Sequence, residues 1–204
     1  MEEYDVHHAY PVLTAGEAIL WRGKPKRGAF IAAKSLTLFP IAVVWLIFDL
    51  NFIGKVFSSG EMLGFLIPFF TLHLMPVWVW LANVISANRR WKNTHYYLTN
   101  RRIIIQGGFF AVNETSLFYK ELRNAHLRVG LMNKLFQTGD IAFDDGFTVH
   151  NNKQNKGHAF EALEDADAVY RRVQKVILDM QTDMEYPNAF RPEENPGYQT
   201  QYRP

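Results

Sequence analysis

The chain contains no cysteine among its 204 residues. This absence excludes disulfides, thiolate nucleophiles and cysteine-ligated zinc or iron–sulfur sites. A large charge of either sign is also lacking, because 22 Lys and Arg stand against 20 Asp and Glu, for a formal net charge of +2. So small a charge gives no indication of nucleic-acid binding, and we predict no nucleic-acid partner.

The motifs of common enzyme classes are missing as well. The sequence has no P-loop, no G-x-S-x-G elbow and no H-E-x-x-H pair of metal ligands. Asp140, Asp144 and Asp145 resemble a carboxylate cluster, but turn and hairpin chemistry explains them more simply. We therefore predict that the protein is not an enzyme and has no catalytic residue, metal or cofactor.

Two long runs lack a polar face. "SLTLFPIAVVWLIFDLNFI" (35–53) and "MLGFLIPFFTLHLMPVWVWLANVI" (62–85) each approach the ~20 residues that a helix needs to cross a bilayer. Two buried helices of a soluble protein are the alternative, but such helices usually show a polar side. The first run begins behind charged residues, so we expect no cleaved signal peptide. The sequence predicts an integral membrane protein with a hairpin of two transmembrane helices.

Basic residues flank the same end of both runs, whereas the loop "GKVFSSGE" (54–61) between them has one lysine and one glutamate. By the positive-inside rule, this bias predicts that both termini are cytoplasmic. The flanking residues are Arg22, Lys24, Lys26, Arg27 and Lys34 before the first run, and Arg89, Arg90 and Lys92 after the second.

Asp49 and His73 are polar residues within the two runs. Their depths along the helices agree closely enough for them to pair, and such a pair can mark a proton or ion path. In the alternative, which we favour because two spans offer little to line a path, Asp49 reaches the headgroups and His73 hydrogen-bonds a helix neighbour.

After residue 94 the pattern changes to short aromatic and β-branched segments separated by Gly, Asn and Asp. It predicts an all-β barrel or sandwich that begins with a hairpin around Asn100 and Arg101. The predicted strands are 95–99, 102–110, 115–122, 125–130, 138–145, 146–152 and 157–163. Apolar residues at three- and four-residue steps then predict an amphipathic helix over 164–180, and the aperiodic end predicts a disordered tail.

"YYLTNRRIIIQGGFF" (96–110) resembles the first hairpin of the bacterial pleckstrin-homology (PH) domain family in YdbS-like membrane proteins. "GEAILWRGKP" (16–25) before the apolar runs and "VGLMNKLFQTGDIAF" (129–143) after them match the same order of motifs. Gln137 departs from the pattern, since such proteins often carry glycine there. The resemblance implies an α+β membrane protein of the bacterial inner membrane, in which a transmembrane hairpin precedes a PH-like, seven-stranded split β-barrel with a C-terminal helix.

The predicted parts are an N-terminal cytoplasmic segment (1–28), the hairpin (29–85), a basic linker (86–94), the PH-like domain (95–182) and the tail (183–204). PH-like barrels bind headgroups or peptides rather than carry out chemistry. We therefore predict a membrane-anchored binding or scaffolding module. The runner-up is an oligomeric transporter or channel component that uses Asp49 and His73.

Five basic residues after the second apolar run, two of them at the turn of the predicted β-hairpin, form a cluster without an acidic residue, which can contact anionic headgroups. They are Arg89, Arg90, Lys92, Arg101 and Arg102. The candidates for lipid or partner binding are Arg89, Arg90, Lys92, Arg101, Arg102, Lys153 and Lys156. The first three also fit as ordinary topology determinants, and the last two as residues of a solvated loop. The edge near "TSLFYKEL" (115–122) can pair with a protein partner or a second copy of the chain.

Overall fold

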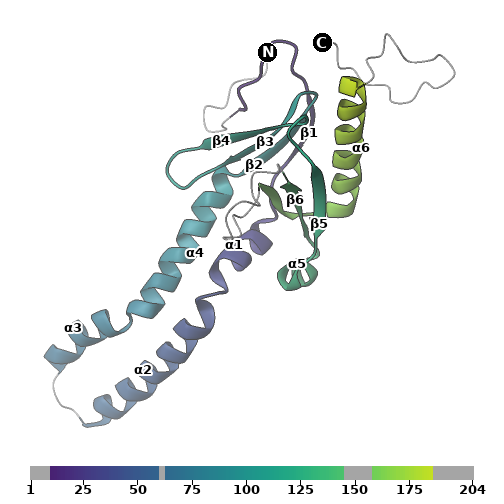
Figure 1. The fold of residues 1–204 in the computed structure, drawn as a ribbon. Coiled ribbons are helices and arrows are strands. Elements are labelled where there is room, and N and C mark those ends of the chain that lie inside the picture. The colour runs from purple at the N-terminus through teal and green to yellow at the C-terminus, as the bar shows by residue number, and fades with distance from the viewer. Residues whose placement is uncertain (1–9, 60–62, 145–157, 186–204) are drawn as a thin grey trace.

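The computed structural model describes residues 10–59, 63–144 and 158–185. Strands and helices alternate irregularly along this part of the chain (Figure 1). The strands are β1 (Ile19–Gly23), β2 (His95–Thr99), β3 (Arg102–Gly107), β4 (Asn113–Phe118), β5 (Asn124–Arg128), β6 (Gly139–Asp144) and β7 (Ala159–Leu163). The helices are α1 (Arg27–Ser35), α2 (Phe39–Ser59), α3 (Leu63–His73), α4 (Met75–Asn93), α5 (Leu131–Phe136) and α6 (Ala166–Glu185).

The strands form two antiparallel sheets with the orders β1-β2-β3-β4 and β5-β6-β7. β1 pairs with β2 although the first four helices separate them in sequence, so these helices are an insertion between neighbouring strands. The predicted domain boundary at residue 95 is therefore wrong at its N-terminal side. The sheet domain includes Ile19–Gly23 as well.

The predicted β-hairpin around Asn100 and Arg101 is confirmed as β2 and β3, with Tyr96 opposite Ile105 and Leu98 opposite Ile103. Its second strand ends at Gly107, three residues before the predicted end. Gly108 has a φ of +148°, and a Cβ there would meet the carbonyl oxygen of Ala111 at 1.9 Å. Only glycine fits this position, so the chain turns here instead of continuing the strand.

Four further predicted strands are confirmed with shifted ends as β4 to β7, and the predicted strand 146–152 lies outside the described residues. The structure describes seven strands, and β1 is the one that the sequence analysis did not predict. Residues 131–136 form α5, which was not predicted either. Gln137 ends this helix in the left-handed conformation, with a φ of 53°. The turn thus forms without the glycine that is usual in such a position, at some cost in backbone strain.

The core lies between the two sheets and α6. Tyr96, Ile103 and Phe160 are fully buried at its centre. On α6, Val173, Ile177 and Met180 are buried against the sheets, which confirms the predicted apolar stripe. The helix runs to Glu185, so residues 183–185 are not part of a disordered tail, and the rest of the predicted tail lies outside the described residues.

Helices α2, α3 and α4 (Phe39–Asn93) form what we call the helical arm. Neither predicted run is one continuous helix, because the first is interrupted between α1 and α2 and the second at Leu74. Pro76 lies in the first turn of α4 and has no N–H to donate to the preceding helix. The indole N–H groups of Trp78 and Trp45 donate instead to the carbonyls of Thr71 and His73, at 3.1 and 2.7 Å. Neighbouring side chains thus satisfy carbonyls beside the break.

Among the described residues, no single helix is long and apolar enough to cross a bilayer. Arg27–Ser35 and Phe39–Lys55 meet the requirement only as a pair, bent by 68°.

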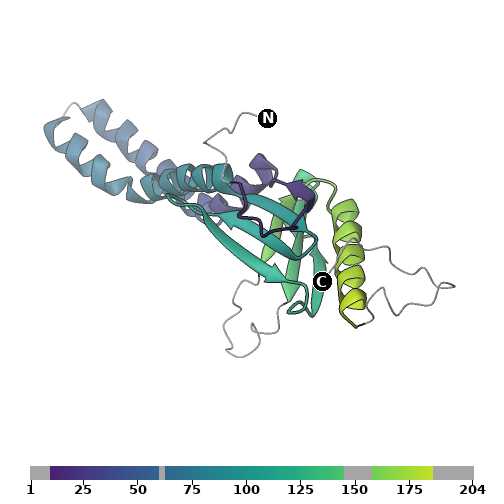
Figure 2. The same cartoon turned by 90° about the horizontal axis from the view of Figure 1, so that it is seen from above.

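The helical arm projects from one side of the sheet domain, and α6 lies on the other side (Figures 1 and 2). α4 is followed after one residue by β2, so the base of the arm is fixed to the sheet by a very short connection. α1 packs against α4, α5 and β7 and so fills the junction between arm and sheets.

Candidate functional site

Five exposed cations surround the base of the helical arm, and we call them the basic collar: Lys24, Arg27, Arg89, Arg90 and Lys92. Trp91 organises part of it, since the Lys24 ammonium and the Arg27 guanidinium lie 4.2 and 5.6 Å from the centre of its ring. The Trp91 indole in turn donates to the carbonyl of Pro25 at 2.7 Å. No carboxylate of the described residues forms an ion pair with the collar. The collar therefore keeps its positive charge available to an external anion.

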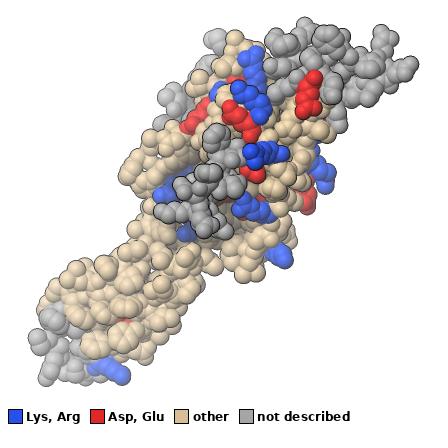
Figure 3. Space-filling view, in the orientation of Figure 1, with Lys and Arg blue, Asp and Glu red and all other residues tan. Residues whose placement is uncertain are grey.

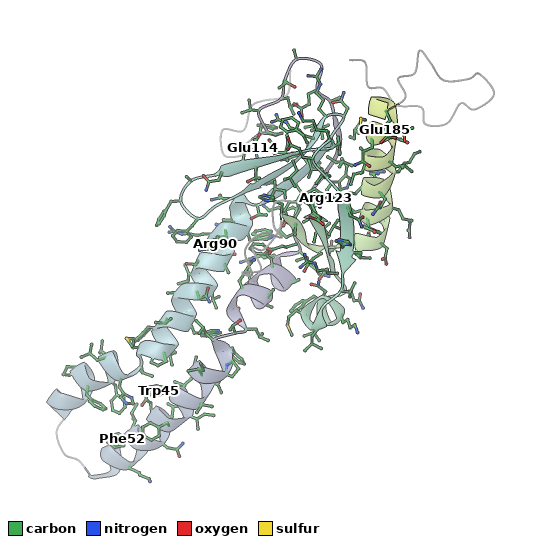
Figure 4. All side chains as sticks on the ribbon, viewed as in Figure 1. Trp45, Phe52, Arg90, Glu114, Arg123 and Glu185 are labelled. Atoms are coloured by element: carbon green, nitrogen blue, oxygen red, sulfur yellow. The ribbon has the colours of Figure 1, made fainter. Side chains whose placement is uncertain are left out.

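The predicted binding residues Arg89, Arg90 and Lys92 belong to this collar, on the last turns of α4. Figure 4 shows Arg90 where the arm meets the sheet domain. Lys24 and Arg27 were expected only as topology determinants, and the contact with Trp91 brings them into the same surface.

Arg101 and Arg102 do not join the collar. β2 leads away from α4 for five residues, at about 3.4 Å each, so the turn between β2 and β3 is at the far end of the sheet. The prediction that Arg101 and Arg102 form one cluster with the basic residues at the end of α4 is wrong, because the five residues of β2 separate the turn from α4. Arg102 is also occupied internally: its guanidinium Nε lies 3.0 Å from Glu17 Oε1 and its Nη1 donates to Ser116 at 2.8 Å.

Two apolar protrusions at the base of the arm were not predicted. The turn between β3 and β4 carries Phe109 and Phe110, and Phe110 is 85% exposed. Asn93 at the end of α4 donates to the carbonyl of Gly108 at 3.2 Å, which fixes this turn beside the arm. α5 carries Leu131 and Leu135, 78% and 71% exposed.

Figure 1 shows this turn and α5 on opposite sides of the base of the arm. One sequence feature could have indicated the first protrusion: Phe109 and Phe110 directly follow two glycines. Because aromatic residues are common in strands, the sequence analysis placed both in the predicted strand 102–110. We call the two together the apolar tips: Phe109 and Phe110, and Leu131 and Leu135.

Asp49 and His73 are paired within the helical arm. His73 Nδ1 lies 2.7 Å from Asp49 Oδ1, and Asp49 is only 1% exposed. The rings of Trp45 and Phe69 lie 5.3 and 5.1 Å from the His73 ring. Asp49 thus pairs with His73 and is buried, whereas the favoured alternative had it reach the headgroups.

The other candidates take structural positions or fall outside the described residues. Lys153, Lys156 and Asp145 are among the residues that are not described. Asp140 accepts a hydrogen bond from the Ala162 backbone at 2.7 Å, which ties β6 to β7. β4 ends the order of its sheet, so the edge predicted near residues 115–122 is present in the described structure. Within the described ranges, no group of three or more His, Asp or Glu side chains is arranged to hold a metal ion.

Part of the chain is similar to known proteins. The family described as "Bacterial PH domain" matches residues 37–177. Among solved structures, the chain is similar to a DUF1696 family protein with a pleckstrin-homology domain from Shewanella loihica PV-4. The identity is 18%, over 43% of this chain and 69% of that chain, with a TM-score of 0.29. No curated protein matches the chain.

Proposed function

The chain belongs to the bacterial PH domain family, and from this we propose that it is a binding or scaffolding module anchored in a bacterial cytoplasmic membrane. The helical arm is inserted in the bilayer as in YdbS-like proteins, and both termini are cytoplasmic. The sheet domain lies against the inner surface and contacts anionic headgroups through the basic collar. The proposal assigns no catalytic step to the protein.

The exposed apolar surface of the helical arm is the observation that carries the proposal. Most of the arm is free of charged side chains in Figure 3, whereas acidic and basic residues gather on the sheet domain. Water-soluble proteins rarely expose continuous apolar patches of this extent. Eight large apolar residues of the arm are each more than half exposed: Ile41, Val44, Ile47, Phe48, Leu50, Leu72, Met75 and Ile85.

The features at the base of the arm support the proposed orientation, in which the sheet domain lies against the inner surface of the membrane. Basic residues are favoured on the cytoplasmic side of a span, and the collar provides five of them. Attraction of each basic residue to an anionic surface contributes about 1 kcal/mol. The apolar tips stand at the level where a bilayer surface would meet the sheet domain, so their exposed side chains would enter the interface.

Membrane anchoring is tested by extraction of the full chain, expressed in a bacterial host. We expect it to stay with the membranes through washes in high salt and alkaline carbonate, and to be released by detergent. Ile47→Arg should lower the fraction that stays, because arginine at the centre of a span costs about 2.5–3.5 kcal/mol on insertion scales. Leu178→Arg is the matched control, since Leu178 on α6 is also about half exposed and lies outside the arm. Release of the unmodified chain by carbonate would overturn the proposal.

The apolar tips give a separate test that uses the absence of native cysteine. Single cysteines in place of Phe110 and Leu135 can carry an environment-sensitive dye such as NBD in protein reconstituted into bilayer nanodiscs. We expect blue-shifted emission at both positions, because both side chains enter the interface. Phe118→Cys and Leu178→Cys are the controls, as these exposed residues lie away from the arm, and their dyes should report water. Water-like emission at residues 110 and 135 would show that the sheet domain does not rest on the membrane.

A further inference from the structure

A groove of about 520 Å³ lies where α1, α4 and α5 meet at the base of the helical arm. This volume is within the range of small-molecule sites in proteins, which is roughly 300–1,000 Å³. Its walls are almost entirely apolar and come from Ile31, Ala32, Phe39, Trp80, Val84 and Phe136. Only helices and their ends line it, so it offers no strand edge to an extended peptide.

One end of the groove is positively charged. Among the described residues that line the groove, Arg27 is the only charged one, and it stands at the start of α1. A hydrogen bond of 3.1 Å from its Nε to Asn88 holds the guanidinium in place, while the Lys24 ammonium lies 4.2 Å from the centre of the nearby Trp91 ring. Lys26, by contrast, is engaged with Glu164 at 3.1 Å. The charge available at this end of the groove therefore comes from Arg27 and Lys24.

The other end of the groove opens toward the apolar surface of the arm. Phe39 and Trp80, whose ring centres are 5.5 Å apart, line it there. Leu36 and Phe39 are partly exposed, and Ile41 continues this exposed surface along α2. A ligand that fits must accordingly have an anionic head and a long apolar chain, with the chain directed along the arm.

We infer that the groove binds one acyl chain of an anionic phospholipid from the surrounding membrane, with the phosphate on Arg27 and Lys24. The inference rests on the proposed function, because only an arm inserted in the bilayer brings the groove to the depth of the headgroups. The bound lipid would fill the space between α1, α4 and α5 and so join the arm to the sheet domain. Guanidinium groups suit phosphate well, since their N–H groups match its oxygens in geometry.

Native mass spectrometry of the full chain tests the inference. The protein is released from detergent micelles that contain equal amounts of phosphatidylglycerol and phosphatidylcholine, and retained lipids are counted. We expect one phosphatidylglycerol per chain. Arg27→Gln should lower its preference over phosphatidylcholine about fivefold, as expected for one basic residue near the headgroups. Arg172→Gln removes an exposed charge on α6, outside both the groove and the collar, and should leave the preference of this retained lipid unchanged.

Variants that fill the groove provide the second part of the experiment. Ala32→Trp should abolish retention of either lipid, whereas Ala33→Trp should retain it, because Ala33 is an exposed neighbour that does not line the groove. Ala32→Leu fills less space and serves if the tryptophan variant does not give a monodisperse protein. Equal retention in both Ala32 variants and the parent would overturn the inference, as would a parent chain that retains no lipid. Carbonate extraction of the membranes from which each variant is purified separates the two proposals. A chain that stays in the membrane but retains no lipid contradicts only the groove, and a chain that is released contradicts the anchoring.

Discussion

Replacing Arg102 with alanine is expected to lower the free energy of unfolding of the sheet domain by about 3–5 kcal/mol, because it leaves a buried carboxylate without its counter-charge. The side chain of Glu17 is fully buried, and that of Arg102 is 13% exposed. Two nitrogens of the guanidinium reach the two carboxylate oxygens, at 3.0 and 3.2 Å. Thr99 also donates its hydroxyl to Glu17 at 2.8 Å, so the pair joins the segment before β1 to the turn between β2 and β3.

The adjacent arginine provides a matched control. Arg101 makes one exposed contact, from Nη1 to the Thr14 hydroxyl at 3.2 Å. Arg101→Ala should change stability by no more than about 0.5 kcal/mol, as is usual for surface substitutions. Hydrogen exchange of the amides in β1, β2 and β3, followed by mass spectrometry on the full chain in detergent, measures both variants. Equal effects of the two substitutions would show that the buried pair has no special role.

The pH dependence of stability provides an independent check on this pair. Burial alone would raise the pKa of Glu17, but hydrogen bonds from Arg102, the Thr14 backbone and the Thr99 and Thr14 hydroxyls outweigh it and lower the pKa from 4.5 to about 2. Because the folded-state pKa is the lower one, the carboxylate stabilises the fold above pH 4.5. This contribution, roughly 3 kcal/mol from the size of the shift, is lost as the pH falls toward 2. In Glu17→Gln, this part of the acid sensitivity should be absent.

Local patterns predicted the elements whose evidence lies within a few neighbouring residues. The β2–β3 hairpin and the apolar stripe of α6 follow from period and turn chemistry, and both are present. β1 was missed because its partner, β2, follows only after the whole helical insertion, and three of its five residues are exposed. The spacing of apolar residues within a short segment gives no information about pairing between strands so far apart in the sequence.

Only part of the candidate site was predicted, again because some of its residues are far apart in the sequence. The collar residues of α4 are adjacent in sequence and were found, whereas Lys24 and Arg27 join them only through the contact with Trp91. The apolar tips were missed because exposed phenylalanine and leucine look like strand or core residues in a sequence. The groove was missed because its walls come from separate helices.

Replacing His73 with alanine is expected to destabilise the helical arm, by about 2.5–3.5 kcal/mol if the site lies within the bilayer. The Asp49 carboxyl would lose its partner at Oδ1, and its Oδ2 already has no hydrogen-bond partner among the described residues. A buried carboxyl that lacks hydrogen-bond partners costs free energy. Thermal denaturation of the full chain in detergent, monitored by size-exclusion chromatography, measures the loss.

The double variant Asp49→Leu, His73→Phe distinguishes a structural role of the pair from a role in proton transport. A buried pair can often be replaced by apolar residues of similar size at little cost, so the double variant should be closer to the parent in stability than His73→Ala. Asn51→Leu is the control, since Asn51 is exposed on the same helix and, within the described residues, its side chain donates to the Ile47 carbonyl of its own helix. A scaffold should keep its membrane anchoring and lipid retention in the double variant. If proteoliposomes of the parent carry a proton flux that the double variant abolishes while its fold is retained, the pair belongs to an oligomeric transporter instead, because one helical arm per chain cannot enclose a path alone.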